Sequence, residues 1–198
     1  EVGCGQGEFL SVLKEFPVEG FGIEHKEDLV KLARTKGLNV EQGFVEDGKT
    51  KIVGAPFDVF LSFNFFEHQP NPNEMLQGIY NNLTDDGMGL ITVPSLEYIL
   101  EHDGYYELIR DHLAYYTFDT LRFILEKNGF EVLEQEMVNR DTLAMIVRKR
   151  KKVDISNLID SYSYIRKEII AYIDSEIAIG HKVGIWGASH QGFTLAAT

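Results

Sequence analysis

The sequence predicts an α/β fold with a mainly parallel sheet that ends in an antiparallel hairpin. Two observations lead to this prediction. Short apolar runs alternate with segments whose apolar residues recur every three or four positions, and the last two apolar runs of residues 1–150 are separated by only a short polar turn. Alternating strands and helices form right-handed βαβ units with parallel strands. Two strands that are joined by a turn too short for a helix are antiparallel.

The expected elements follow one another through the first 150 residues. Apolar runs bounded by turn residues predict strands at 21–24, 38–42, 57–62, 88–93, 130–137 and 143–147. Helical spacing predicts helices at 26–36, at 73–83, and over the segment that Thr117 caps and Asn128 and Gly129 end. A further helix is expected directly after the glycine turn that ends at Gly7.

The chain is expected to have two parts. Residues 1–150 form the domain just outlined, and residues 151–198 hold a long amphipathic helix over 154–179 and a second glycine turn at 184–192. A strand that enters such a turn predicts the start of a second, Rossmann-like α/β unit. Because both glycine turns lie close to a chain end, we expect each part to be a truncated piece of a longer protein.

Composition narrows the classes of partner and site. The formal charge is 19 − 31 = −12, and an acidic surface disfavours nucleic acid as a partner. No apolar run reaches the roughly 20 residues that span a bilayer, so no membrane association is expected. We expect a cytoplasmic protein, since no signal peptide is visible. Cys4 is the single cysteine, and we predict no metal site.

A glycine-rich turn at the start of the chain predicts a nucleoside site. Gly3, Gly5 and Gly7 form a G-x-G-x-G pattern between a strand and a helix, where backbone N–H groups are open to a ligand. Glu24 ends the next strand, and a carboxylate there can accept both hydroxyls of a ribose. The spacing differs from the G-x-G-x-x-G of dinucleotide sites, and the acidic Glu1 suits a cationic ligand.

These residues resemble the first motif of class I S-adenosylmethionine-dependent methyltransferases. The segments 57–68 and 83–91 are similar to the fourth strand of that family and to the approach to its fifth, and the resemblance covers residues 1–150. It implies a Rossmann-like methyltransferase sheet and S-adenosylmethionine as the cofactor. The cofactor-binding residues that it implies are Gly3, Gly5 and Gly7 under the methionine part, Glu1 near its ammonium, Glu24 at the ribose, His25 and Phe44 at the adenine, Asn64 and Phe65 at the sulfonium, and His68 at a position that is commonly His.

A second resemblance concerns the acceptor. The segment 184–192 after the long helix looks like the start of the C-terminal domain of sugar C-methyltransferases. The segment 111–116 is similar to their Glu-His-x-x-Tyr-Phe element, with Asp111 in place of the Glu. This resemblance implies a small-molecule acceptor such as a nucleotide-linked keto-sugar.

The same segment holds the candidate catalytic residues His112, Asp111 and Tyr115. Methyl transfer requires the acceptor to lose a proton, and the pKa of His suits a general base near neutral pH. A purely structural role is the alternative for His112, and aromatic packing is the alternative for Tyr115. Other function classes also stay open at this point: an O- or N-methyltransferase of another metabolite, a nicotinamide-dependent oxidoreductase, or a non-catalytic nucleotide-binding module.

Overall fold

The computed structural model describes residues 1–151, 153–184 and 187. The chain divides into two compact units, residues 1–151 and 152–198. Most of the second glycine turn, and with it the expected start of a second α/β unit, lies outside the described residues.

One parallel pair of strands follows the glycine turn. β1 (Phe21–Glu24) pairs with β2 (Asn39–Gln42) in parallel, with Phe21 opposite Asn39. The helices α1 (Glu8–Leu13) and α2 (Glu27–Thr35) belong to the same region. Their apolar residues form a small core of their own, whose members are Cys4, Leu10, Val30, Ala33, Leu38 and Val40. The predicted elements of this region are confirmed.

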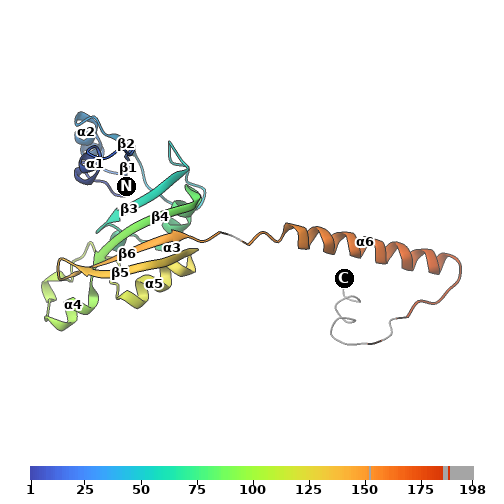
Figure 1. Ribbon diagram of the computed structural model, residues 1–198. Coiled ribbons are helices and arrows are strands. Elements are labelled where there is room, and N and C mark those ends of the chain that lie inside the picture. Colours follow the sequence, from blue (N-terminus) through green and yellow to red (C-terminus); the bar gives the residue numbers. More distant parts are fainter. Residues whose placement is uncertain (152, 185–186, 188–198) are drawn as a thin grey trace. The chain divides into compact units, whose positions relative to one another are not determined.

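The other strands form a four-stranded mixed sheet in the order β3-β4-β6-β5 (Figure 1). β3 (Phe57–Phe63) and β4 (Leu83–Pro94) are parallel, whereas β5 (Phe130–Val138) and β6 (Thr142–Lys149) form the predicted antiparallel hairpin. β4 begins five residues earlier than predicted, at Leu83. The register between β3 and β4 shifts between Phe57 and Val59. On β4 this irregular stretch contains Asp86 and Gly87, the pair that predicted a turn.

The first residues connect the two groups of strands. The Val2 N–H donates to the Leu61 carbonyl at 2.8 Å, and the Ile23 N–H donates to the Glu1 carbonyl at 3.0 Å. Val2 also forms a parallel bridge with Ile23. Glu1 and Val2 therefore run between β1 and β3, and the glycine turn lies at the edge where these parallel strands end (Figure 1).

Two helices pack on the mixed sheet and contribute to the large core. α3 (Pro72–Asn81) buries Met75, Leu76 and Ile79, and α5 (Phe118–Lys127) buries Leu121 and Leu125. They share one apolar cluster with residues of the mixed sheet, among them Ile91, Val93, Phe130, Leu143 and Met145. Apolar residues at helical spacing in these two segments predicted both helices, and α3 ends two residues earlier than expected.

The segment between β4 and α5 contains structure that the sequence did not predict. α4 (Leu96–Glu101) begins at Ser95, whose hydroxyl accepts the Tyr98 N–H at 3.2 Å. A 3₁₀ helix, η2 (Tyr105–Glu107), follows. Both are shorter than two full turns, too short for a periodic apolar pattern to be recognised.

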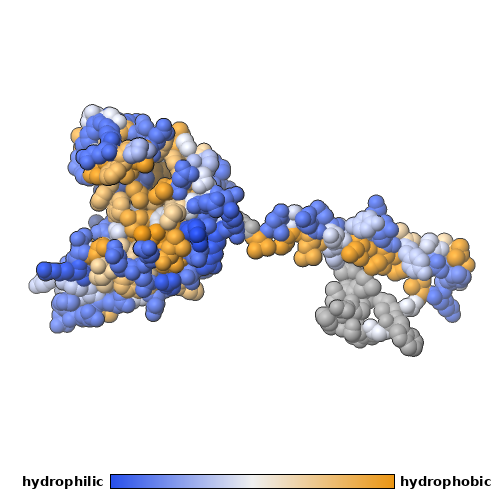
Figure 2. Space-filling view, in the orientation of Figure 1, coloured by the Kyte–Doolittle hydropathy of each residue, from blue (hydrophilic) through white to orange (hydrophobic). Residues whose placement is uncertain are grey.

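The second unit contains the predicted long helix, α6 (Ser156–Ala178). Leu158, Ile159, Tyr162 and Ile165 are all more than half exposed on it, and Figure 2 shows hydrophobic residues along one side of the helix. None of the described helices combines the length and the apolar character that a membrane crossing requires.

Loss of the cap of α5 should measurably destabilise the first unit. The Thr117 hydroxyl accepts the Thr120 N–H at 3.2 Å, and the Thr120 hydroxyl accepts the Thr117 N–H at 2.9 Å, which is a capping box. We expect Thr117→Ala to lower the free energy of unfolding by about 1 kcal/mol in a denaturant titration. Thr117→Ser keeps the hydroxyl and should stay close to the wild type. Equal stability of all three proteins would contradict a role for the cap.

Candidate active site

The three glycines of the turn have different tasks. All have positive φ, 73° at Gly3, 55° at Gly5 and 80° at Gly7, a region that side chains with a Cβ rarely adopt. A Cβ on Gly7 would lie 2.3 Å from the Leu38 side chain, so Gly7 is required by packing. A Cβ on Gly5 would meet only a Glu8 carboxylate oxygen, at 3.9 Å. The backbone at Gly5 is therefore the part of the turn with space for a ligand.

The buried carboxylate of Glu24 is fixed at the end of β1. Its Oε2 accepts the Gly5 N–H at 3.0 Å and its Oε1 accepts the Lys26 N–H at 2.9 Å. Only 5% of the residue is exposed, and His25 Nδ1 lies 3.0 Å from Oε1. Each carboxylate oxygen can accept more than one hydrogen bond. Glu24 thus keeps acceptor capacity for ligand hydroxyls while it holds the glycine turn in place.

A small hollow gathers several of the predicted cofactor-binding residues. Its lining includes Gly3, Glu24, His25, Phe44 and Phe65. The rings of His25 and Phe44 are stacked, with centroids 4.6 Å apart and an angle of 20°. The two rings therefore form one continuous aromatic surface at the hollow.

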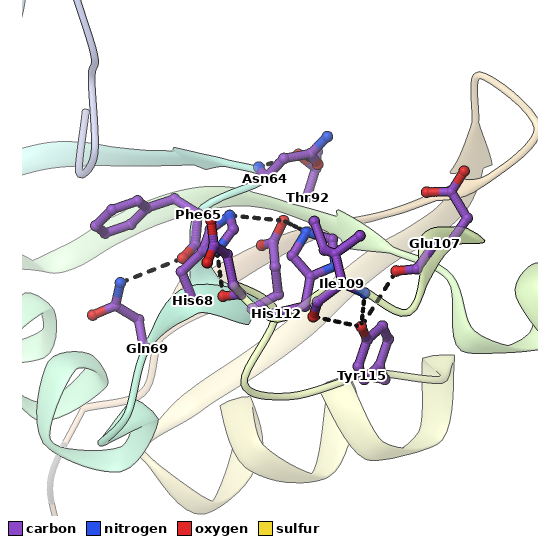
Figure 3. A network of polar contacts seen from close by, with 11 residues as sticks. Asn64, Phe65, His68, Gln69, Thr92, Glu107, Ile109, His112 and Tyr115 are labelled. Atoms are coloured by element: carbon purple, nitrogen blue, oxygen red, sulfur yellow. Dashed lines mark hydrogen bonds and ion pairs between the residues drawn. The ribbon is translucent and has the colours of Figure 1, made fainter. Parts of the chain in front are cut away.

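Asn64 and Phe65 follow β3 and lie next to the turn. A Cβ on Gly3 would be 2.3 Å from the Phe65 ring, so this ring directly covers Gly3. Asn64 has a positive φ of 44°, and its side-chain oxygen accepts the Thr92 hydroxyl at 3.0 Å (Figure 3). Asn tolerates this backbone conformation better than most residues. The structure therefore brings both residues to the edge where β3 and β4 end.

Glu1 does not line the hollow at Glu24. It lines a separate, larger cavity instead. Burial raises the pKa of Glu1 to about 7, and its Oε2 has no hydrogen-bond partner among the described residues. The contact of Glu1 with a ligand ammonium stays a prediction. The same holds for the place of Gly7 under the methionine part, since Gly7 does not line the hollow either.

A second polar cluster lies beside this edge and consists of Glu67, His68 and His112 (Figure 3). Glu67 and His68 belong to the 3₁₀ turn η1 (Phe66–His68) after β3. The Glu67 carbonyl accepts the N–H groups of Leu113 and Ala114 at 2.9 and 3.2 Å, which fastens the segment of His112 to this turn. His68 Nε2 and His112 Nε2 lie 3.8 and 4.0 Å from Glu67 Oε1.

Burial perturbs the protonation of this cluster. Glu67 is only 2% exposed, and burial raises the pKa of its carboxyl. Burial and the neighbouring His68 lower the pKa of His112, whose side chain is 11% exposed. Glu67 Oε2 and His112 Nδ1 are buried without a hydrogen-bond partner in the described part of the chain. Sequence reasoning missed Glu67, although its position beside His68 at a strand end was a usable signal.

The structure places the other two catalytic candidates in supporting positions. The backbone carbonyl of Asp111, and not its carboxylate, contacts His68 Nδ1, at 2.7 Å. The Tyr115 hydroxyl accepts the Ile109 N–H at 2.9 Å and lies 3.3 Å from the carbonyl oxygens of Glu107 and Ile109. Tyr115 therefore ties its own loop together, and its ring meets His112 edge-on at 5.7 Å.

Comparison with known proteins identifies the fold and the enzyme class. The family described as "Methyltransferase domain" matches residues 1–135. The chain belongs to this methyltransferase family. The prediction of an S-adenosylmethionine-dependent methyltransferase with a Rossmann-like α/β fold is thereby confirmed, and the oxidoreductase alternative is not supported. No curated protein matches the chain significantly.

Solved structures support the same fold. A methyltransferase of Haloferax volcanii, solved in complex with the Trm112 methyltransferase activator, is 19% identical, with a TM-score of 0.64 over 77% of this chain and 82% of that one. An S-adenosylmethionine-dependent methyltransferase of Archaeoglobus fulgidus is 23% identical, with a TM-score of 0.58 over 75% and 84%. The plantazolicin methyltransferase BpumL, solved with a desmethylPZN analog and SAH, is 16% identical, with a TM-score of 0.60 over 76% and 75%.

Removal of the Glu24 carboxylate should weaken S-adenosylmethionine binding without unfolding the protein. Loss of two charge-assisted hydrogen bonds to a ribose costs about 2–4 kcal/mol, or roughly 30- to 1000-fold in affinity. We expect this increase in Kd for Glu24→Ala by isothermal titration calorimetry. Glu27→Ala is the matched control, because Glu27 is an exposed acid on α2 that pairs with Lys31 at the surface. An unchanged Kd in folded Glu24→Ala would overturn the assignment of the ribose site.

Proposed function

We propose that this methyltransferase acts on a small molecule, and that the cofactor binds across the glycine turn and Glu24 while the acceptor binds beside Glu67, His68 and His112. The observation that carries the proposal is the adjacency of the two sites along one short segment. Phe65 and Gln69 line the hollow at Glu24, whereas Glu67 and His68, which lie between them in sequence, belong to the polar cluster.

The residues of the hollow fit S-adenosylmethionine. Glu24 would accept the ribose hydroxyls, the His25–Phe44 stack would support the adenine, and the open backbone at Gly5 would admit the methionine part. When bound, S-adenosylmethionine supplies a methyl group that an acceptor takes by in-line displacement at the methyl carbon, with the sulfonium sulfur as the leaving group. The protein's part is to align the acceptor and promote the loss of its proton.

We assign the removal of that proton to the side chain of His112. Its side chain is nearly buried, its Nδ1 has no partner among the described residues, and two hydrogen bonds to the Glu67 carbonyl hold the chain next to it. These contacts hold the ring at a fixed place, with one ring nitrogen free of hydrogen bonds among the described residues. Tyr115 shapes the loop around His112, and Asp111 orients His68 through its carbonyl.

For the acceptor we propose a nucleotide-linked keto-sugar. Support comes from the resemblance of residues 111–116 to the sugar C-methyltransferase element. A carbon next to a ketone loses its proton to give an enolate, which suits a site with a proton-accepting cluster. Methylation of an oxygen or nitrogen of another metabolite is the competing outcome. Product analysis by mass spectrometry and NMR, with keto-sugar nucleotides and their reduced hydroxyl analogues as acceptors, separates these outcomes.

Calorimetry tests the cofactor side of the proposal. Titration with S-adenosylmethionine and S-adenosylhomocysteine should give binding with one site per chain, whereas NAD should give none. Binding of NAD alone would contradict the proposed use of the hollow.

Replacement of His112 tests the acceptor side. We expect His112→Gln to lower kcat by at least about 100-fold while the Kd for S-adenosylmethionine and the melting temperature stay near wild type. His102→Gln is the control, because His102 is an exposed residue of the same segment that stacks on Tyr98. If His112 only fastens its loop, the variant will instead show a raised KM or a lowered melting temperature with kcat preserved.

A further inference from the structure

Three potential metal ligands converge at the polar cluster. One carboxylate oxygen of Glu67 and one ring nitrogen each of His68 and His112 all lie within 4.8 Å of one another. We infer that Glu67, His68 and His112 form a binding site for a divalent first-row transition-metal cation. This inference revises the sequence-based prediction of no metal site, which considered cysteine ligands and did not consider that residues 67–68 and 112 meet.

Hydrogen bonding sets His68 up as a ligand. Its Nδ1 lies 2.7 Å from the carbonyl oxygen of Asp111. A carbonyl oxygen can only accept, so Nδ1 carries a proton, and Nε2 is the ring nitrogen that could bind a metal. That Nε2 points toward Glu67 Oε1 at 3.8 Å. Histidines that ligate metals commonly donate their other ring N–H to a carbonyl in this manner, which fixes both ring orientation and tautomer.

The cluster contains buried polar atoms without partners. Glu67 Oε2 and His112 Nδ1 are both buried without a hydrogen-bond partner in the described residues. Among those residues, the ion-pair partners of Glu67 are only the two histidines. An isolated buried carboxylate is costly unless it is paired or coordinates a metal. A bound cation would satisfy Glu67 and both ring nitrogens at once.

The chemistry of the ligands selects the class of cation. Two imidazole nitrogens and one carboxylate oxygen suit Zn²⁺, Co²⁺, Mn²⁺ or Fe²⁺, whereas Mg²⁺ and Ca²⁺ prefer oxygen ligands throughout. Ligands of a bound ion lie about 2.0–2.2 Å from it, hence roughly 3–3.5 Å from one another. Glu67 Oε1 lies 3.8 and 4.0 Å from the two ring nitrogens and all three atoms lie within 4.8 Å of one another, so the side chains would have to move closer together to bind an ion.

A site with three protein ligands leaves coordination positions open, as catalytic sites do. The His68 side chain is about one-third exposed, so the cluster borders solvent on the side of His68. If the proposed function holds, an oxygen of the acceptor would occupy an open position, and the cation would stabilise the enolate or alkoxide that forms when the acceptor releases its proton to water. His112 would then promote this loss as a ligand. The inference favours acceptors with a hydroxyl or an enolisable carbonyl.

Titration of the metal-free full chain with Co²⁺ tests the site directly. We expect one equivalent of Co²⁺ to bind with a visible absorption band that reports nitrogen and oxygen ligands, and Zn²⁺ to displace it. At a free Zn²⁺ concentration about 100 times its Kd, the melting temperature of the first unit should rise by about 5 °C or more. Glu67→Gln and His112→Gln should each raise the Kd for Co²⁺ at least about 100-fold and abolish the thermal shift.

Matched variants keep the test decisive. His181→Gln removes a histidine that pairs with Glu176 at 2.7 Å in the second unit, and it should bind Co²⁺ as the wild type does. Circular dichroism verifies that the cluster variants are folded, and Glu67→Gln retains the shape of the side chain. Absence of a one-equivalent site in the wild type, or equal Co²⁺ binding by folded Glu67→Gln, would overturn the inference. Intact S-adenosylmethionine binding in that case would leave the proposed function standing.

Discussion

The backbone carbonyl of Glu67 is the contact on which the candidate acceptor site depends. It accepts two N–H groups, from Leu113 and Ala114, and so joins the turn after β3 to a loop more than 40 residues further along the chain. Without this joint, His112 would have no fixed position relative to Glu67 and His68. A third hydrogen bond joins the same two segments, from His68 Nδ1 to the Asp111 carbonyl. Backbone groups thus position the side chains that carry the proposed chemistry.

The cofactor side is organised by a carboxylate in a comparable way. Glu24 accepts the N–H of Gly5 and that of Lys26, so one buried side chain fixes the glycine turn and the end of β1 together. The three glycines of this turn all have positive φ, but each has a different neighbour. Gly7 makes room for Leu38, Gly3 makes room for the Phe65 ring, and Gly5 alone faces open space. Substitutions at the three positions should therefore affect packing and ligand access to different degrees.

The sequence predicted those features that local patterns encode. Apolar periodicity located α2, α3, α5 and α6, and the short turn before β6 predicted the antiparallel hairpin. The pattern singled out both Gly5 and Glu24 as cofactor-binding residues, but it did not predict that the Glu24 carboxylate accepts the Gly5 N–H. Glu67 was not assigned a role, because its importance arises only when a distant loop delivers His112. The backbone contacts of Tyr115 and Asp111 were equally invisible, since carbonyl and N–H groups are the same in every residue type.

The five residues from Phe65 to Gln69 connect the two halves of the proposed reaction. Phe65 and Gln69 line the hollow at Glu24, and a hydrogen bond of 3.3 Å from the Gln69 side chain to the Phe65 carbonyl closes the turn (Figure 3). Glu67 and His68, within that turn, face His112. In-line methyl transfer requires donor and acceptor to be held at a fixed distance and angle. Under the proposed function, the 3₁₀ turn η1 provides that constraint, because the residues that flank it line the hollow while Glu67 and His68 within it belong to the polar cluster.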